Sequence, residues 1–318
     1  MTNGIQKDLH PLLKIAEWLG IIVAAITILM AVWLLLPIDH AAPFNLLVFQ
    51  AVQAVCTFIV PAWMVARLWS AQPESFLHLK PLEQTDRTLL LISIATMICA
   101  LPLINCLAYY NSKITLPASL HGLELRMMAL EERAAAMLKA FMSIGDGSLI
   151  FLLINLLVLA VLPAIGEEMT FRGVLQSLLS AKRSNSDSGQ QSAISNQQSA
   201  ISNQQSHIVV WLTAFIFSFI HFQFYGFIPR LLIGALLGYA LVWSNNLIYS
   251  ITMHATNNML AVLLFYIATF VLHLPEGQLD YLGTGDTWWL TAVSLPLTLA
   301  GILLFYRRAR QLSADKQM

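Results

Sequence analysis

The sequence is poor in charge. Only 11% of its 318 residues are Asp, Glu, Lys or Arg, against about a quarter in an ordinary soluble domain. The 17 Lys and Arg balance the 17 Asp and Glu, so there is no basic excess to neutralise phosphates. This composition excludes an electrostatic nucleic-acid binder, and the 58% hydrophobic content excludes a disordered chain. Nucleic acid is therefore not an expected partner.

Cysteine is also scarce. The three cysteines, Cys56, Cys99 and Cys106, all lie inside apolar runs, and none has C-x-x-C or metal-ligand spacing. We interpret them as small buried hydrophobic residues without a redox role.

Long apolar runs are abundant instead. Each is about 20 residues long, enough to cross a hydrocarbon core about 30 Å thick. They predict an all-α, polytopic membrane protein with about eight transmembrane helices. The expected spans are Ile15–Leu36, Phe44–Trp69, Thr88–Tyr110, Leu149–Leu179, Ile208–Phe227, Arg230–Tyr249, Ile251–Leu274 and Trp288–Tyr306.

The first of these runs resembles a signal peptide because Lys7 and Lys14 precede it. Ile15–Leu36 is too long for the apolar region of a signal peptide, and no A-x-A cleavage site follows it. We expect a retained first span.

The distribution of Lys and Arg predicts the orientation. With a cytoplasmic N-terminus, eleven of these residues fall in inside segments and five in outside segments, which satisfies the positive-inside rule. We therefore expect an integral multi-pass protein of the cell or inner membrane with both termini cytoplasmic. The inside residues are Lys7, Lys14, Arg67, Lys80, Arg87, Lys182, Arg183, Arg307, Arg308, Arg310 and Lys316, and the outside residues are Lys113, Arg126, Arg133, Lys139 and Arg230.

Two segments are not expected to span. Residues 114–144 place apolar side chains near one side of a helix, which predicts a helix lying in the outer interface or, alternatively, a substrate gate. The apolar positions are Leu116, Leu120, Leu123, Met127, Leu130, Ala134, Met137 and Phe141. Residues 184–206 contain QQSAISN twice and have no apolar face, so a disordered cytoplasmic insert is expected there.

Three spans hold nearly all the membrane-embedded polar residues. An ionised group at the centre of a membrane costs roughly 2.5–3.5 kcal/mol on insertion scales, so such residues are expected to face one another or a wet cavity. They are Glu167, Glu168 and Arg172 in the fourth span, His221 in the fifth, and His254, Asn257 and Asn258 in the seventh.

Helical spacing separates the two glutamates. Glu168 and Arg172 are four residues apart, so they share a face and are expected to pair. Glu167 lies about 100° round the helix and is left free to accept a proton. His254 and Asn258 are also four residues apart on one face, from which two donors can reach an oxyanion.

Other interpretations of these residues stay open. A single buried histidine is commonly a satisfied core residue, and a Glu–Arg pair is often only a clamp. Glutamate, histidine and asparagine side chains are also competent metal ligands, but H-E-x-x-H and H-x-x-x-H do not occur. The concentration of polar residues on three spans favours an active site.

The same residues resemble the motifs of the CPBP family of intramembrane proteases, which comprises type II CAAX prenyl proteases and bacteriocin-processing, Abi-like proteins. Glu167-Glu168-Met-Thr-Phe-Arg172 is similar to its E-E-x-x-x-R motif. Phe217-Ser-Phe-Ile-His221 is similar to F-x-x-x-H, and His254-Ala-Thr-Asn-Asn258 to H-x-x-x-N. The resemblance extends from about Phe151 to Leu274; each motif alone is weak, but the ordered set is specific.

The resemblance implies an endopeptidase with about eight helices around a membrane-embedded polar cavity. It implies that Glu167 is the general base, that His221 positions the water with it, and that His254 and Asn258 form the oxyanion hole. Glu168 and Arg172 would support the site. The implied chemistry is glutamate-type with no required cofactor, and zinc stays an alternative. The implied substrate is a membrane-associated protein or peptide, which a CAAX-type enzyme would take in prenylated form.

The expected organisation has three parts: 1–147 with the N-terminal spans and the interfacial helix, 148–274 with the catalytic core and the insert, and 275–318 with the last span and a basic tail. Two other functions compete with the protease. A transporter or ion-conducting protein could use the polar cluster, although no inverted repeat is visible. A non-catalytic scaffold or immunity protein of the same fold is the third hypothesis.

Overall fold

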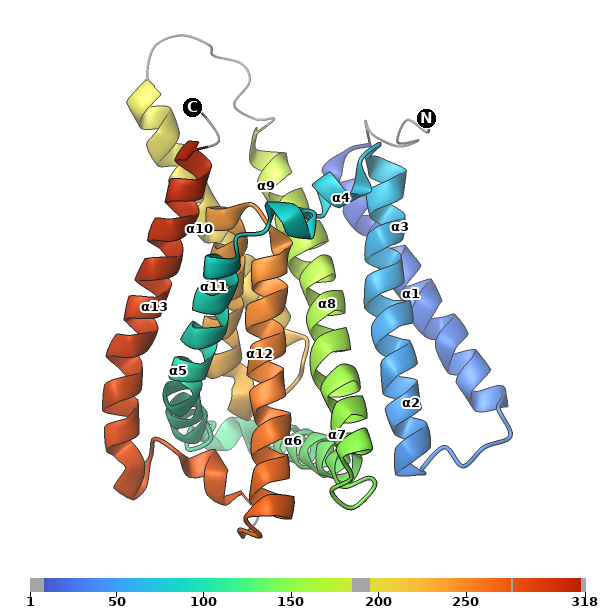
Figure 1. Cartoon of the computed structure of the whole chain (residues 1–318). Helices are drawn as coiled ribbons and strands as arrows, with labels where there is room; N and C mark the ends of the chain where they lie inside the picture. Colours follow the sequence, from blue (N-terminus) through green and yellow to red (C-terminus); the bar gives the residue numbers. More distant parts are fainter. Residues whose placement is uncertain (1–8, 185–194, 276, 316–318) are drawn as a thin grey trace.

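The computed structural model describes residues 9–184, 195–275 and 277–315. Within these ranges the chain is a bundle of long helices with one helix lying across its end (Figure 1). In chain order the α-helices are α1 Pro11–Leu35, α2 Pro43–Gln53, α3 Val60–Trp69, α4 Pro73–Phe76, α5 Arg87–Asn111, α6 His121–Met142, α7 Leu149–Asn155, α8 Leu162–Glu168, α9 Ser177–Ser184, α10 Ser195–Phe219, α11 Phe227–Ser244, α12 Leu247–Tyr266 and α13 Trp288–Asp315. The wider π-helical segments are η1 Ala54–Ile59, η4 Leu156–Val161, η5 Met169–Gln176 and η7 Ile267–Val271. The short 3-10 turns are η2 Leu82–Gln84, η3 Ala118–Leu120, η6 Phe224–Gly226, η8 Gln278–Tyr281 and η9 Gly285–Thr287.

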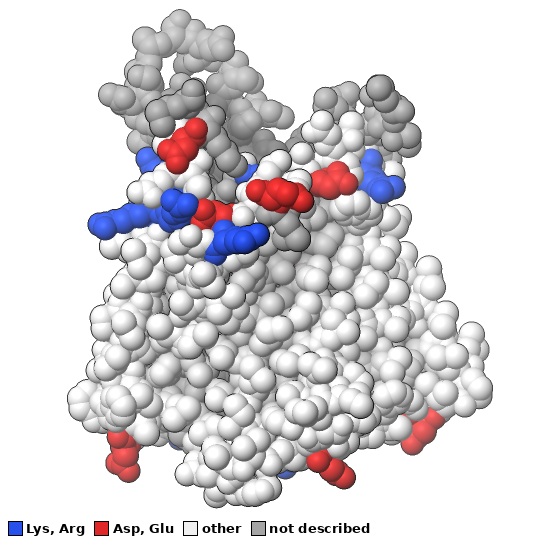
Figure 2. Space-filling model, in the orientation of Figure 1, with Lys and Arg blue, Asp and Glu red and all other residues white. Residues whose placement is uncertain are grey.

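The predicted all-α membrane architecture is confirmed. Among the described residues, seven helices are long and apolar enough to cross a membrane. They are Pro11–Leu35, Pro43–Trp69, Arg87–Asn111, Leu149–Ser180, Phe224–Ser244, Leu247–Val271 and Gly285–Asp315. In the view of Figure 2, Lys, Arg, Asp and Glu gather toward the two ends of the molecule and leave the middle uncharged, as expected of a protein surrounded by lipid. The chain is an integral multi-pass membrane protein.

The fifth predicted span is wrong at its C-terminal end. The helix ends at Phe219 instead of Phe227, its apolar part is only Ser206–Phe219, and the next span begins at Phe224. Phe222 adopts a left-handed conformation, with φ of 53°, and reverses the chain there. Hydropathy misses this turn because apolar phenylalanines occupy both sides of it.

The predicted insert is only partly tested. Residues 185–194, which include part of the first QQSAISN copy, lie outside the described residues. From Ser195 onward the chain belongs to α10, so the prediction of disorder is wrong for residues 195–206. No Gly or Pro interrupts this stretch, and the helix of the following apolar span therefore continues backward into it.

The chain ends lie on one side of the bundle. The start of α1, the end of α13 and the ends of α9 and α10 that flank the insert all lie at the top of Figure 1. This arrangement agrees with an even number of crossings. The assignment of that side to the cytoplasm stays a prediction.

The predicted interfacial segment contains α6, which lies across the opposite end of the bundle (Figure 1). Of the predicted apolar positions, Met127, Ala134 and Phe141 turn toward the protein, and Leu123 and Leu130 are exposed. The inward face also carries two acids, Glu124 and Glu131.

Close packing of α11 depends on two glycines. A Cβ atom at Gly238 would lie 2.9 Å from Val210 Cγ1 and 3.0 Å from Gln176 Oε1. Gln176 Nε2 also donates to the Gly238 carbonyl at 3.2 Å. Gly234, one turn earlier, allows Arg172 to make the same kind of contact. These contacts explain why G-x-x-x-G occurs on this helix.

We expect Gly238→Leu to lower the free energy of unfolding by about 1–3 kcal/mol, because the added side chain overpacks the contact with α10 and η5. Gly20→Leu on α1 is the matched control, since a Cβ there meets nothing within 4 Å. Melting temperatures of the purified variants in one detergent measure both effects. Equal melting temperatures would contradict the packing described here.

Candidate active site

Glu167 and Glu168 lie on one long helix that runs from Leu149 to Ser184 through α7, η4, α8, η5 and α9. Two wider π-helical stretches interrupt it, and all eight residues of the second, η5, are buried. Such wide turns are frequent at functional sites. Gly166 brings this helix against η1, where a Cβ would lie 2.8 Å from Phe58 Cβ. The backbone that carries both glutamates is therefore fixed by a neighbouring helix.

The predicted pair of Glu168 and Arg172 is confirmed. Arg172 Nη1 donates to Glu168 Oε1 at 2.8 Å, and both side chains are fully buried. Arg172 Nη2 donates to the Gly234 carbonyl at 2.9 Å, and its guanidinium lies 4.5 Å from the Phe217 ring. A buried ion pair is stable only when further contacts satisfy its members. These contacts from α10 and α11 do so in part.

His254 joins this pair from α12. Its Nδ1 donates to Glu168 Oε1 at 2.8 Å, and its Nε2 lies 3.8 Å from Glu167 Oε2. The histidine is therefore held between the two glutamates, with one ring nitrogen bound and the other directed to Glu167. The sequence did not predict the contact with Glu168, because the two residues are 86 positions apart.

His221 lies just beyond the end of α10, in the turn that returns the chain to α11. Its Nδ1 donates to the Phe217 carbonyl at 2.7 Å. A carbonyl can only accept, so this bond places the hydrogen on Nδ1 and leaves Nε2 as an acceptor. Asn111 supports the same turn: its Nδ2 donates to the Phe224 carbonyl at 2.8 Å and its Oδ1 accepts from the Ile228 amide. Irregular backbone at membrane depth requires such partners.

Asn257 and Asn258 follow His254 by three and four residues on α12. Asn257 Nδ2 donates to Asn258 Oδ1 at 3.2 Å. This contact directs the amide oxygen of Asn258 toward its neighbour and leaves the Nδ2 group of Asn258 as a donor. The predicted helix face with His254 and Asn258 is thus present.

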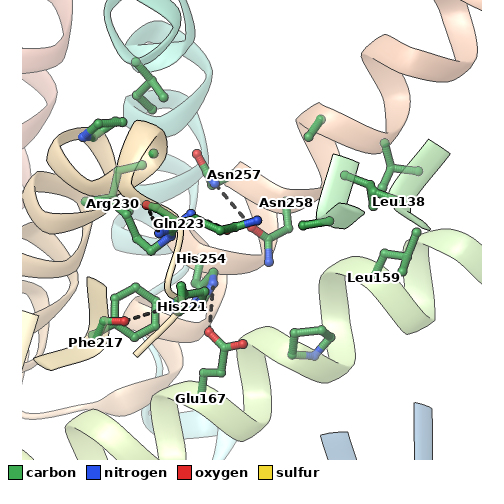
Figure 3. A pocket seen from close by; sticks show the side chains of 18 of the residues that line it. Leu138, Leu159, Glu167, Phe217, His221, Gln223, Arg230, His254, Asn257 and Asn258 are labelled. Atoms are coloured by element: carbon green, nitrogen blue, oxygen red, sulfur yellow. Dashed lines mark hydrogen bonds and ion pairs between the residues drawn. The ribbon is translucent and has the colours of Figure 1, made fainter. Parts of the chain in front are cut away.

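A cavity of about 510 Å³ brings the predicted site residues together (Figure 3). Glu167, His221, His254 and Asn258 all line it, and Glu167 is 16% exposed. Glu168 and Arg172 lie behind this wall, in the interior of the bundle. The predicted catalytic residues thus line the cavity, and the predicted supporting residues do not. The volume is in the range of small-molecule and peptide side-chain pockets.

Sequence reasoning missed two lining residues, Arg230 and Gln223. Arg230 was expected to be an outside charge at the start of the sixth span. The structure instead places it in the first turn of α11, on the cavity wall, hydrogen bonded to Gln223. Its position at the edge of an apolar run was the available signal. Helix α6 also lines the cavity, through Met137 and Leu138 among others.

Among the described residues, no group of three or more His, Cys, Asp and Glu side chains is arranged to hold a metal ion. The metal alternative therefore gains no support from the donor set.

Comparison with known families agrees with the location of the site. Residues 149–260 match the family model described as Type II CAAX prenyl endopeptidase Rce1-like. This part of the chain is similar to the Rce1-like family. The match begins at the first residue of α7 and includes all six predicted site residues, from Glu167 to Asn258. The resemblance drawn from the three motifs is thereby confirmed.

The matched region covers about a third of the chain. Helices α1 to α6 precede it and α13 follows it. No curated protein and no solved structure matches the chain. The match supports an enzyme of the protease type.

Proposed function

We propose that the protein is an intramembrane endopeptidase that hydrolyses a peptide bond of a membrane-associated protein or peptide. One observation carries the proposal. A carboxylate, an imidazole acceptor and two donor groups face the same cavity in the region that matches the Rce1-like model, and His221, His254 and Asn258 are each oriented by a hydrogen bond.

In this proposal a water molecule lies between Glu167 and His221. The water donates one hydrogen to the carboxylate and the other to His221 Nε2, which is the acceptor nitrogen of the neutral ring because Nδ1 donates to the Phe217 carbonyl. Its lone pair then points to the substrate carbonyl. Glu167 removes a proton as the oxygen attacks, and the carbonyl carbon becomes tetrahedral. Glu167 next gives this proton to the leaving nitrogen, so that an acid and an amine are released.

His254 and Asn258 stabilise the negative oxygen of the tetrahedral intermediate. His254 lies between two carboxylates, with Nδ1 bound to Glu168 and Nε2 directed to Glu167. Protonated His254 donates from Nε2, and Asn258 donates from Nδ2. Oriented donors of this kind cost no reorganisation when the charge develops.

Glu168 and Arg172 are positioning residues in this account. Glu168 Oε1 accepts from both Arg172 and His254, and Arg172 is tied to α11 through Gly234. The ion pair thereby fixes α8, α11 and α12 relative to one another. It does not line the cavity.

The substrate we propose carries a lipid or another apolar anchor, as a CAAX-type prenylated chain does. Met137, Leu138 and Leu159 form an apolar part of the cavity wall, and further apolar side chains of α6 are exposed. We also propose that both termini lie in the cytoplasm.

Replacement of Glu167 by Ala in growing cells identifies the natural substrate. Membrane-associated peptides that wild-type cells shorten should accumulate at full length in the variant strain, and mass spectrometry of the membrane fraction detects them. Glu132→Ala, on the exposed side of α6, is the control. Identical peptide profiles in the Glu167→Ala and wild-type strains would contradict the proposal.

A chelator separates the glutamate mechanism from a metal mechanism. We expect EDTA to leave the rate of peptide cleavage by the purified protein unchanged within twofold. Loss of activity on chelation, with recovery on adding zinc, would show that the water is activated by a metal.

A further inference from the structure

Arg230 is the only lysine or arginine among the described residues that line the cavity. Its Nη2 donates to Gln223 Oε1 at 2.7 Å and its Nη1 to the Gln223 carbonyl at 3.4 Å. Both partners are neutral. An ionised side chain within a membrane-spanning helix is costly, and it is retained where it meets a counter-charge or a function.

The fold makes a place for this guanidinium. Gly226 lies one turn earlier, and a Cβ atom there would be 2.9 Å from Arg230 Nη2. The guanidinium therefore lies against the backbone of the turn between α10 and α11, held on one side by Gln223. It is half-buried and accessible from the cavity.

Two carboxylates act on Arg230 through their charge without forming an ion pair with it. They are Glu131 on α6 and Glu167 on α8. In the described part of the chain, neither forms an ion pair with it within 4.0 Å. Burial raises the pKa of Glu131, which favours its neutral form, and Glu167 is committed to the water. The guanidinium thus keeps unused donors on the substrate side.

We propose that Arg230, held by Gln223, is the subsite for a carboxylate of the substrate. This inference rests on the proposed function. Arginine has five N–H donors in a planar fork, of which Gln223 uses two. The remaining donors match the two oxygens of a carboxylate, and such charge-assisted bonds are strong in a site removed from water.

The layout of the cavity gives the bound chain a direction. In Figure 3, Arg230 and Gln223 lie at one end of the pocket, and Leu138 and Leu159 lie at the other. In this view His221 lies below Gln223 and Glu167 lies below His221. A substrate with an apolar anchor at the leucine end and a carboxylate at the arginine end therefore passes through the cavity that Glu167 and His221 line.

The carboxylate that Arg230 binds can have two sources: the C-terminus of the substrate chain, or the side chain of an Asp or Glu residue. Three farnesylated peptides of one sequence distinguish them: a free acid, a C-terminal amide, and an amide whose last residue is replaced by Glu. We expect the purified wild-type protein to cleave the free acid with a kcat/KM at least about tenfold above that of the plain amide, mainly through a lower KM. An equal advantage for the Glu-containing amide assigns the subsite to any carboxylate at that place.

Arg230→Gln should remove this preference, so that acid and amide peptides are cleaved with similar kcat/KM. Arg230→Lys keeps the charge and should keep part of the preference, which separates recognition from a structural role. Arg133→Gln, on the exposed side of α6, is the control and should behave as the wild type does.

The outcomes that overturn the two proposals differ. If the wild-type protein cleaves the acid and both amides with equal kcat/KM, the carboxylate subsite is wrong and the proposed function stands. If the Arg230→Gln variant keeps the full acid preference, the subsite is also wrong. If the wild-type protein cleaves none of the peptides, the proposed function fails for this substrate class and the subsite fails with it.

Discussion

Glu167→Gln should lower kcat by a factor on the order of 10² or more and leave the protein folded. Glutamine preserves the size of the side chain and its ability to accept a hydrogen bond from water, but it cannot take the proton. Glu167 is 16% exposed and lines the cavity, whereas Glu168 has no exposed surface. The loss should therefore appear in turnover and not in the melting temperature.

Glu132→Gln is the matched control for this prediction. It makes the same chemical change on the exposed side of α6, outside the cavity. Its kcat should equal that of the wild type. Glu168→Gln is the informative contrast, because it weakens the contacts with Arg172 and His254 and should lower stability together with activity. A Glu167→Gln variant that turns over at the wild-type rate would refute the assignment of the base.

Asn258→Ala and His254→Ala should each lower kcat by about 10²–10³, because each removes one donor to the developing oxyanion. Asn258→Ala is the cleaner variant. In the described part of the chain, its Nδ2 group has no hydrogen-bond acceptor, so its removal leaves no protein group unpaired there. His254→Ala also removes a donor from the buried Glu168 and should lower the melting temperature.

Thr256→Ala is the control on the same helix. Its hydroxyl donates only to the backbone carbonyl of Thr252, one turn earlier, so activity should not change. Single-turnover kinetics with saturating peptide measures the chemical step for all three variants. Full activity of Asn258→Ala would show that this amide does not contact the oxyanion.

Much of the site was predictable because its parts follow helical spacing. Glu168 and Arg172 meet at four residues' separation, and His254 and Asn258 share one face of α12. The rarity of polar residues in the spans then identified which helices must meet, since an ionised group in lipid needs a partner. The order of the three motifs then predicted that His221 belongs to the same site as the polar residues of the other two helices.

The rest depended on contacts between distant segments. Spacing on one helix does not reveal that Glu168 bonds His254, 86 residues away, or that Asn111 closes the turn that carries His221. The end of α10 at Phe219 was hidden because the following turn is itself apolar. Arg230 was assigned to the outside because its helix begins earlier than hydropathy indicated, at Phe227 instead of Arg230.

The most direct test of the account is the cleavage of a farnesylated peptide by the purified protein in detergent, followed by mass spectrometry. We expect two products whose masses sum to that of the peptide plus one water, formed by the wild type and at least about 100-fold more slowly by Glu167→Gln. Detergent removes the sealed compartments that a transporter needs, so cleavage there identifies hydrolysis as the activity. An intact peptide with the wild-type protein, together with a Glu167-dependent ion flux into sealed vesicles, would contradict the account.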